Sequence, residues 1–269
     1  MAQEFAGKIA LDIRDSVPDW APYLAPKAKA DAPNVVFIVW DDVGYGTMDC
    51  FGGPVRTPTM GRIADRGVKY GNFHTTALCS PTRAALITGR NHHSAGFGVI
   101  SEQSTGFPGY NSIIDRDKAT IGRMLKDNGY STAWFGKDHN VPAFQASAVG
   151  PFDQWPIGMG FEYFYGFVGG DANQWQPNLF RNTTQIYPFK GQEGSWNLVT
   201  AMADDAIDYM TRLHQTQPDK PLFIKYAPGA THAPHHPTQE WVQKIQAMKL
   251  FDDGYEKLRE RIFANQKRL

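Results

Sequence analysis

Three short apolar runs, each followed by side chains that can carry out chemistry, constrain the fold of this chain more than any other feature. The runs are NVVFIVW (34–40), STAWFG (131–136) and KPLFIKYAPG (220–229). Continuous apolar runs rich in β-branched residues are typical of strands that are buried on both faces of a parallel sheet. Helical patterns separate the runs, so the alternation predicts a layered α/β fold around a largely parallel sheet.

Each predicted strand delivers a pair of polar side chains to its carboxyl end. The pairs are, in chain order, Asp41 with Asp42, Lys137 with His139, and His232 with His235. Ligands of open α/β sheets bind at the carboxyl ends of the strands. We therefore expect the three pairs to meet at one edge of the sheet.

Helix signals lie between and beyond these strands. Thr57 is a candidate N-cap for a helix that begins at Pro58 and ends at Gly67, because proline suits the first helical position and glycine the end. Further helical patterns cover 118–130, 196–215 and 238–269.

Three segments have no helical signal. Residues 1–33 read as an irregular lead-in, and 68–76 is a candidate short strand. The segment 140–195 is rich in Gly, Pro and aromatic residues and would wall a substrate cleft, or its aromatic side chains would fill the core. Those side chains are Trp155, Tyr163, Phe164, Tyr165, Trp175 and Tyr187.

Composition excludes some partners and suggests a compartment. The 269 residues carry a formal net charge of zero, whereas nucleic acids and anionic membranes call for a basic face, so we expect neither partner. No apolar run has the length of a membrane span, and the first residues lack the apolar core of a signal peptide. Two cysteines fit a reducing compartment, so we expect a cytoplasmic protein.

Asp41 and Asp42 allow two readings. Acidic residues after a strand often cap the next element. Paired carboxylates at the edge of a sheet also suit a hard cation such as calcium or magnesium. The residue types alone leave both readings open.

Cys79 stands in the sequence CSPTR, and Pro81 places it at the start of a helix. A buried cysteine is usually inert, but free N–H groups at a helix N-terminus would lower the pKa of a thiol. Arg83, one turn further, could contact an oxyanion. A cysteine phosphatase loop requires arginine six positions after the cysteine, and Ala85 stands there, which excludes that loop.

The remaining candidates are basic side chains. Lys137 and His139 stand two residues apart, so in an extended segment they would share a side, where they could hold an anion and exchange protons; surface residues are the plainer reading. His232, His235 and His236 lie within one proline-rich loop, and their spacing matches no zinc motif.

Taken together, these motifs resemble the type I sulfatases, and especially the bacterial arylsulfatases, of the alkaline phosphatase superfamily. The segments that carry the resemblance are NVVFIVWDDVGYG, TPTMGRIADRGVKYGNFHTTALCSPTRAALITGRNHHSAG, GYSTAWFGKDHN and YAPGATHAPHHP. Together they cover roughly 34–255. The resemblance implies an alkaline phosphatase-like α/β/α sandwich, with 34–269 as the N-terminal part of the catalytic domain.

The resemblance also implies a mechanism. In this family the cysteine of the Cys-x-Pro-x-Arg motif is oxidised to formylglycine by a dedicated enzyme, whose recognition sequence includes the Pro and the Arg. The hydrated aldehyde attacks the sulfur of a sulfate ester, and its second hydroxyl then expels sulfate. Cys79 would be that residue. The implied substrate is a small-molecule sulfate ester, most simply an aryl sulfate.

Roles for the other residues follow from the resemblance in the same way. Asp41 and Asp42 would bind calcium, rather than magnesium, together with modified Cys79, and Arg83 would stabilise the formylglycine. Lys137 would bind a sulfate oxygen, and His139 would accept the proton of the second hydroxyl. His232 would protonate the leaving alcohol, with His235 as its rival.

The chain departs from the family in three respects. Family members are about twice as long, and their calcium site uses a further Asp–Asn or Asp–Gln pair that the chain lacks, unless Asp252 and Asp253 supply it. Asp138 replaces the usual tryptophan between the lysine and the histidine, and its charge would weaken anion binding unless it faces away. Two alternatives therefore remain: an inactive truncated sulfatase, and a phosphomonoester or phosphonate hydrolase of the same superfamily.

Overall fold

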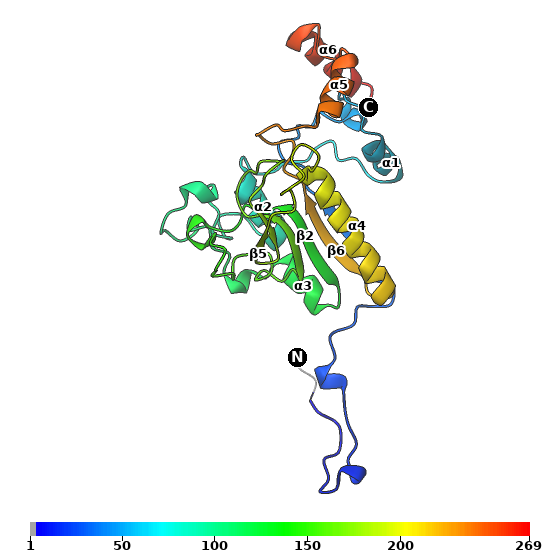
Figure 1. Cartoon of the computed structure of the whole chain (residues 1–269), viewed down its shortest axis with the longest axis vertical. Coiled ribbons are helices and arrows are strands. Elements are labelled where there is room, and N and C mark those ends of the chain that lie inside the picture. The colour runs from blue at the N-terminus through cyan, green and yellow to red at the C-terminus, as the bar shows by residue number, and fades with distance from the viewer. Residues whose placement is uncertain (1–3) are drawn as a thin grey trace.

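A computed structural model describes residues 4–269, and its centre is a six-stranded sheet (Figure 1). The strands are β1 (Val35–Ile38), β2 (Ser131–Lys137), β3 (Tyr163–Phe167), β4 (Leu179–Arg181), β5 (Thr184–Ile186) and β6 (Leu222–Ala227). Their spatial order is β1-β6-β2-β3-β4-β5, in which the first four strands pair in parallel and the pairs β3–β4 and β4–β5 are antiparallel. The three strands expected from the apolar runs are confirmed, and they are neighbours.

Helices cover both faces of this sheet. Helices α2 (Cys79–Thr88) and α3 (Ile121–Asp127) pack on one face, where Ala84, Ile87 and Trp134 share a buried cluster. Helix α4 (Leu198–Thr216) packs on the other face through a second cluster that includes Met202 and Phe135 (Figure 1). The expected α/β/α sandwich is confirmed.

Alternation along β2 explains why its apolar run is continuous. Trp134 points into the α2 and α3 layer, whereas Ala133 and Phe135 point into the α4 layer. Both sides of the strand are therefore out of water. Each large apolar side chain buried in this way contributes roughly 1.5–3 kcal/mol to stability.

Strand β1 lies at the edge of the sheet and is covered on one face only. Val35 and Phe37 pack against the α2 and α3 layer, whereas Val36 and Ile38 remain 48% and 41% exposed. Within the described part of the chain, β1 pairs with β6 alone. This edge therefore presents unpaired backbone groups and apolar side chains to its surroundings.

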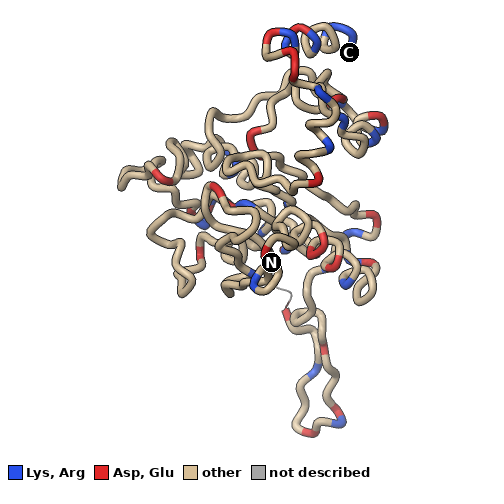
Figure 2. Tube along the Cα trace, turned by 45° about the horizontal axis from the view of Figure 1, so that its top comes forward, with Lys and Arg blue, Asp and Glu red and all other residues tan. Residues whose placement is uncertain are grey.

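The other helices lie beyond the sheet. They are α1 (Pro58–Arg66), α5 (Gln239–Ala247) and α6 (Gly254–Gln266). The last two confirm the helical pattern expected over 238–269. Residues of both charge signs lie along α6 (Figure 2), and Glu256 pairs there with Arg259. No helix among residues 4–269 is long and apolar enough to cross a membrane.

The expected bounds of α1 are confirmed, whereas the strand expected after it is not formed. Thr57 is the N-cap residue, Pro58 begins the helix and Gly67 ends it, although the Thr57 hydroxyl donates to Asp49 Oδ1 at 2.5 Å instead of accepting from the first turn. The segment 68–76 forms no strand. Gly71 interrupts its apolar pattern, and Val68 and Phe73 are 78% and 71% exposed, so no layer exists for a strand to pack on.

The segment 140–195 contributes strands β3, β4 and β5 to the sheet. Of its six aromatic side chains, Trp155, Phe164 and Tyr165 are buried in the core, which favours the structural reading for them. Trp175 and Tyr163 are half-buried, and Tyr187 is 45% exposed.

The remaining short elements are 3-10 turns, and two of them lie before β1. They are Ile13–Asp15, Ala21–Tyr23, Asp49–Phe51, Ser101–Gln103, Arg116–Lys118 and Ala143–Gln145. Residues 4–33 otherwise form an arm that projects from the sheet, and one antiparallel bridge joins Lys8 to Val17 (Figure 1).

Gly136, the residue before Lys137, bends the central strand in a way that only glycine tolerates. Its φ is +91°, and an added Cβ would overlap the carbonyl of Ala227 and lie 2.8 Å from Met202 Sδ. We expect Gly136→Ala to lower the free energy of unfolding by about 2–3 kcal/mol. Urea unfolding measures this loss.

Gly61 provides the control for this substitution. It lies inside α1, and an added Cβ would meet nothing within 4 Å. Gly61→Ala should therefore raise stability by up to about 1 kcal/mol. Equal effects of the two substitutions would contradict the close packing of Gly136 against Ala227 and Met202.

Candidate active site

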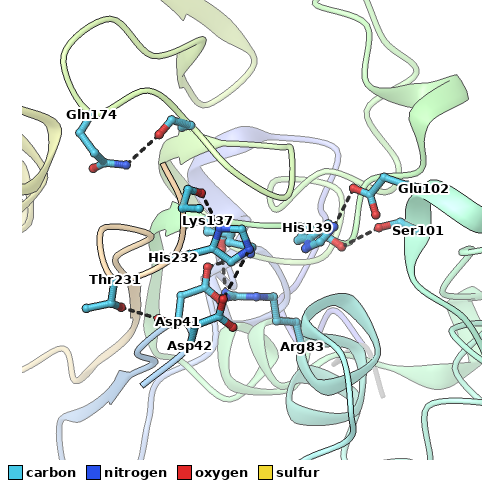
Figure 3. A network of polar contacts seen from close by, with 12 residues as sticks. Asp41, Asp42, Arg83, Ser101, Glu102, Lys137, His139, Gln174, Thr231 and His232 are labelled. Atoms are coloured by element: carbon cyan, nitrogen blue, oxygen red, sulfur yellow. Dashed lines mark hydrogen bonds and ion pairs between the residues drawn. The ribbon is translucent and has the colours of Figure 1, made fainter. Parts of the chain in front are cut away.

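The site lies where β1, β6 and β2 end, on the same edge of the sheet (Figure 3). Asp41 and Asp42 follow β1, Lys137 is the last residue of β2, and His232 follows β6. Because the three strands are parallel neighbours, their carboxyl ends bring these side chains together. The expected meeting of the three pairs is confirmed for these four residues.

Asp41 lies at the centre of a buried ion cluster. Its Oδ1 accepts from Arg83 Nη2 at 3.0 Å, and its Oδ2 accepts from Lys137 Nζ at 2.7 Å. None of the three side chains is more than 4% exposed. Burial raises the pKa of Asp41, but the hydrogen bond from Lys137 and the charges of both cations outweigh it, so this pKa lies below its usual value.

Helix α2 begins at Cys79, as the proline pattern predicts. Leu78 precedes it in extended conformation, and Gly89 ends the helix at φ +64°. Ser80 fastens the first turn, because its Oγ accepts from the backbone N–H of Ser101 and its carbonyl accepts from Asn140 Nδ2, both at 3.0 Å. The helix start therefore has a fixed position next to the ion cluster.

One carboxylate oxygen each of Asp41 and Asp42 and the Sγ of Cys79 lie within 4.8 Å of one another. In the described part of the chain this is the one group of three or more acidic, histidine or cysteine side chains arranged like metal ligands. Two carboxylates suit a hard cation, and an oxygen in place of Sγ would suit it better. Calcium takes six to eight oxygen ligands, so these residues supply about half of a shell.

Asp252 and Asp253 do not complete this cation site. They stand in the turn before α6, and Asp253 pairs with Arg261 of that helix. Figure 1 shows α5 and α6 beyond the sheet edge, beside α1. This stretch is therefore a turn that leads into a helix, and its two carboxylates lie outside the cluster formed by Asp41, Asp42 and Cys79.

His139 does not share a side with Lys137, contrary to the expectation for an extended segment. Strand β2 ends at Lys137, and His139 has φ +61°, so the chain turns between them. His139 Nε2 lies 2.8 Å from Glu102 Oε1. Burial and the charge of Lys137 lower the pKa of His139, while Glu102 opposes the shift, so the neutral ring prevails at neutral pH.

His232 contacts the site and His235 does not. His232 Nε2 lies 3.7 Å from Asp42 Oδ2, and the preceding Thr231 donates its hydroxyl to the carbonyl of Asp41. His235 is exposed, and His236 Nδ1 accepts from the backbone N–H of Gln174 at 3.4 Å. Among the described residues, the three histidines are not part of a group with metal-ligand geometry.

Asp138, the residue after Lys137, is buried and only 1% exposed. The charge that acts on it most strongly is that of the fully buried Lys225 of β6, whose Nζ lies 3.2 Å from the ring centre of Trp134. Burial raises the pKa of Asp138 to about 7, against the opposing charge of Lys225.

Sequence reasoning missed five residues around the site. They are Ser80, Ser101, Glu102, Asn140 and Lys225. Lys225 carried a signal, because a lysine in the middle of an apolar strand must find a partner once it is buried. The turn with Ser101 and Glu102 had no such sequence signal, because it does not follow a predicted strand.

Comparisons with known proteins agree with this arrangement. Residues 33–260 match the family model described as Sulfatase. The chain is 26% identical to an arylsulfatase of Klebsiella aerogenes over 88% of its own length and 51% of that protein. It is 30% identical to an N-acetylgalactosamine-6-sulfatase of Rattus norvegicus over 78% of its own length and 41% of that protein.

A solved structure is similar in fold as well as in sequence. The structure of BT4656 in complex with its substrate D-glucosamine-2-N,6-O-disulfate has a TM-score of 0.62 and 25% identity, and it matches 81% of this chain and 38% of that one. The chain spans about half the length, or less, of the curated relatives that it matches.

Proposed function

Since the chain belongs to the sulfatase family, we propose that it hydrolyses sulfate esters with a formylglycine made from Cys79 and a calcium ion. One observation carries the proposal: Cys79 shares a cluster of cation-ligand geometry with Asp41 and Asp42. Arg83 and Lys137 lie against the same carboxylate. A nucleophile, a cation and two fixed positive charges are what attack on a bound sulfate group requires.

Asp41, Asp42 and the oxygen that replaces Sγ at position 79 would hold the cation. With the formylglycine made and the cation bound, the hydrated aldehyde would supply the attacking oxygen and the hydroxyl that later releases sulfate, and the metal would polarise the sulfate group. The other steps fall to side chains of this chain. Arg83 and Lys137 are held by Asp41, so their charges are in place before substrate arrives, which avoids reorganisation during the reaction.

Two histidines would move the protons. His139 is buried and neutral at neutral pH, so it can accept a proton from the hydroxyl at position 79. His232 is partly open to solvent and contacts Asp42 at the opposite side of the site, where a leaving alcohol can take up a proton. Because the two histidines lie at different places in the site, His139 can act as the base and His232 as the acid.

The substrate class that we propose is a small sulfate ester, with aryl sulfates as the simplest members. The Klebsiella relative is named an arylsulfatase, whereas BT4656 has a sulfated glucosamine as its substrate. A panel that contains an aryl sulfate, a sulfated hexosamine and a phosphate monoester separates these choices. Preference for the phosphate ester would instead support a phosphomonoester hydrolase.

The test begins with the protein produced together with a formylglycine-generating enzyme. Peptide mass spectrometry reports whether Cys79 is converted, and hydrolysis of a chromogenic aryl sulfate is followed with calcium and after chelation. We expect turnover that chelation abolishes and that calcium restores, because the cation neutralises charge on the sulfate group. Competition with inorganic phosphate against sulfate compares the two anions at the same site.

A second candidate is an inactive sulfatase fragment. The observation that favours it is the cation site, because three donors are fewer than calcium requires and the chain spans about half of its relatives. A fully converted protein that binds calcium weakly and does not turn over would establish this alternative. Turnover at saturating calcium would exclude it.

A further inference from the structure

Glu102 lies against His139, on whose ring the charges of the buried cations Lys137 and Arg83 act. We propose that Glu102 is a positioning residue that fixes the tautomer and the orientation of His139. Its Oε1 lies 2.8 Å from His139 Nε2, and the two side chains come from segments 37 residues apart (Figure 3). The role of His139 as a base belongs to the proposed function, and this assignment rests on it.

The carboxylate determines which ring nitrogen carries the proton. An ionised carboxylate only accepts hydrogen bonds, so Nε2 must donate the proton between them. In a neutral imidazole the other nitrogen, Nδ1, is then an acceptor. His139 Nδ1 is buried and has no hydrogen-bond partner among residues 4–269, so it is the nitrogen left to take a proton within the site.

Glu102 can fix His139 because the turn that carries it is itself fastened. Ser101 donates its backbone N–H to Ser80 Oγ at 3.0 Å and its hydroxyl to the carbonyl of His139 at 3.3 Å. Ser80 follows Cys79 in helix α2. The turn over 101–103 therefore connects the start of the nucleophile's helix to the backbone and the ring of the histidine.

Gly170 lies directly against both Glu102 and the His139 ring. A Cβ added there would lie 2.9 Å from both Cε1 and Nε2 of His139 and 3.3 Å from Glu102 Oε1. Its φ is not in the left-handed region, so alanine is excluded by the neighbouring atoms and not by the backbone. Gly170→Ala would thus displace the pair without deleting a polar group.

Three charged groups act on the His139 ring. Lys137 and Arg83 lower its pKa, as burial does, and Glu102 raises it. Neutralising Glu102 should therefore lower the pKa of His139 further and make it a weaker base. A glutamine still offers an oxygen to Nε2–H, whereas an alanine offers none.

The test reads the ring directly by NMR. Nitrogen-15 spectra of the histidine side chains, with His139 assigned from a His139→Gln sample, report which nitrogen is protonated. The wild-type ring should be protonated at Nε2, and Glu102→Gln should keep that tautomer. Glu102→Ala and Gly170→Ala should give a mixture of both tautomers. Gln103→Ala, exposed in the same turn, is the matched control and should behave as wild type.

Activity adds a second readout that a purely structural residue would not give. In converted protein, Glu102→Ala should lower kcat roughly 10- to 100-fold with KM little changed, by analogy with partners that orient metal-bound histidines. Glu102→Gln should retain more of kcat and shift the acid limb of the pH profile to lower pH.

The outcomes separate this assignment from the proposed function. A single Nε2–H tautomer that survives in Glu102→Ala, or the Nδ1–H tautomer in wild type, would overturn the role of Glu102, whatever the activity. The expected tautomers in a fully converted, inactive protein would support the positioning while rejecting turnover by this chain.

Discussion

A Cys79→Ala variant is expected to lose sulfate ester hydrolysis by at least about 10⁴-fold, because removal of a nucleophile leaves only the binding groups to assist water. The loss should appear in kcat, measured with a chromogenic aryl sulfate after production with the modifying enzyme. Helix α2 should remain intact, since alanine is a better helix former than cysteine and no side-chain hydrogen bond of Cys79 is lost.

The second cysteine supplies the control for this experiment. Cys50 is also a free, half-buried thiol, and it lies in a short 3-10 turn that ends at Phe51. Cys50→Ala should keep activity within about twofold, because Cys50 is not part of the group formed by Asp41, Asp42 and Cys79. Equal activity of the two variants would mean that another group attacks the ester, and the formylglycine proposal would fail.

Replacement of Asp41 by asparagine should produce the largest loss of stability, about 3–5 kcal/mol in the free energy of unfolding. Asparagine keeps the shape of the side chain but removes the charge between Arg83 and Lys137. Both cations are buried and would then face each other without a counter-charge. Chemical unfolding of the unconverted, metal-free protein measures the loss without reference to activity.

Asp42 is the matched control, because it stands next to Asp41 but its side chain is 60% exposed. Asp42→Asn should change stability by less than about 0.5 kcal/mol. Both substitutions should weaken calcium binding, since each removes a charged ligand. A similar loss of stability in both variants would show that the buried ion cluster does not distinguish Asp41.

The same cluster predicts how stability depends on pH. The pKa of Asp41 is lower in the folded protein than in the unfolded chain. The stabilisation by this carboxylate is therefore fully present above the unfolded pKa of about 3.9 and is lost as pH falls through the lowered pKa. Asp41→Asn should lose less stability than wild type on acidification below pH 4.

The sequence predicted the parts of the site that follow strands. Asp41, Lys137 and His232 come from three runs whose apolar patterns are unambiguous, and parallel strands place their ends together. The family resemblance added the significance of Cys79. Both kinds of information are local, since each can be read within a few residues.

Contacts between distant loops could not be predicted in this way. Glu102 reaches His139 because a hydrogen bond joins Ser101 to Ser80, and no hydrophobic periodicity in the sequence predicts that hydrogen bond. The failed strand over 68–76 shows the same limit, because alternation predicts a strand only where another layer exists to cover it. The left-handed turn at His139 likewise depends on its tertiary contacts.

The position of β1 makes the two halves of the site mechanically unequal. Lys137 emerges from β2, which has hydrogen-bonded strands on both sides, whereas Asp41 and Asp42 emerge from an edge strand held by β6 alone. Backbone amides facing an open edge exchange with solvent through smaller openings than those within a sheet. We therefore expect the backbone at Asp41 and Asp42 to open more readily than the backbone at Lys137, so a bound cation would find its ligands on the strand that can adjust to it.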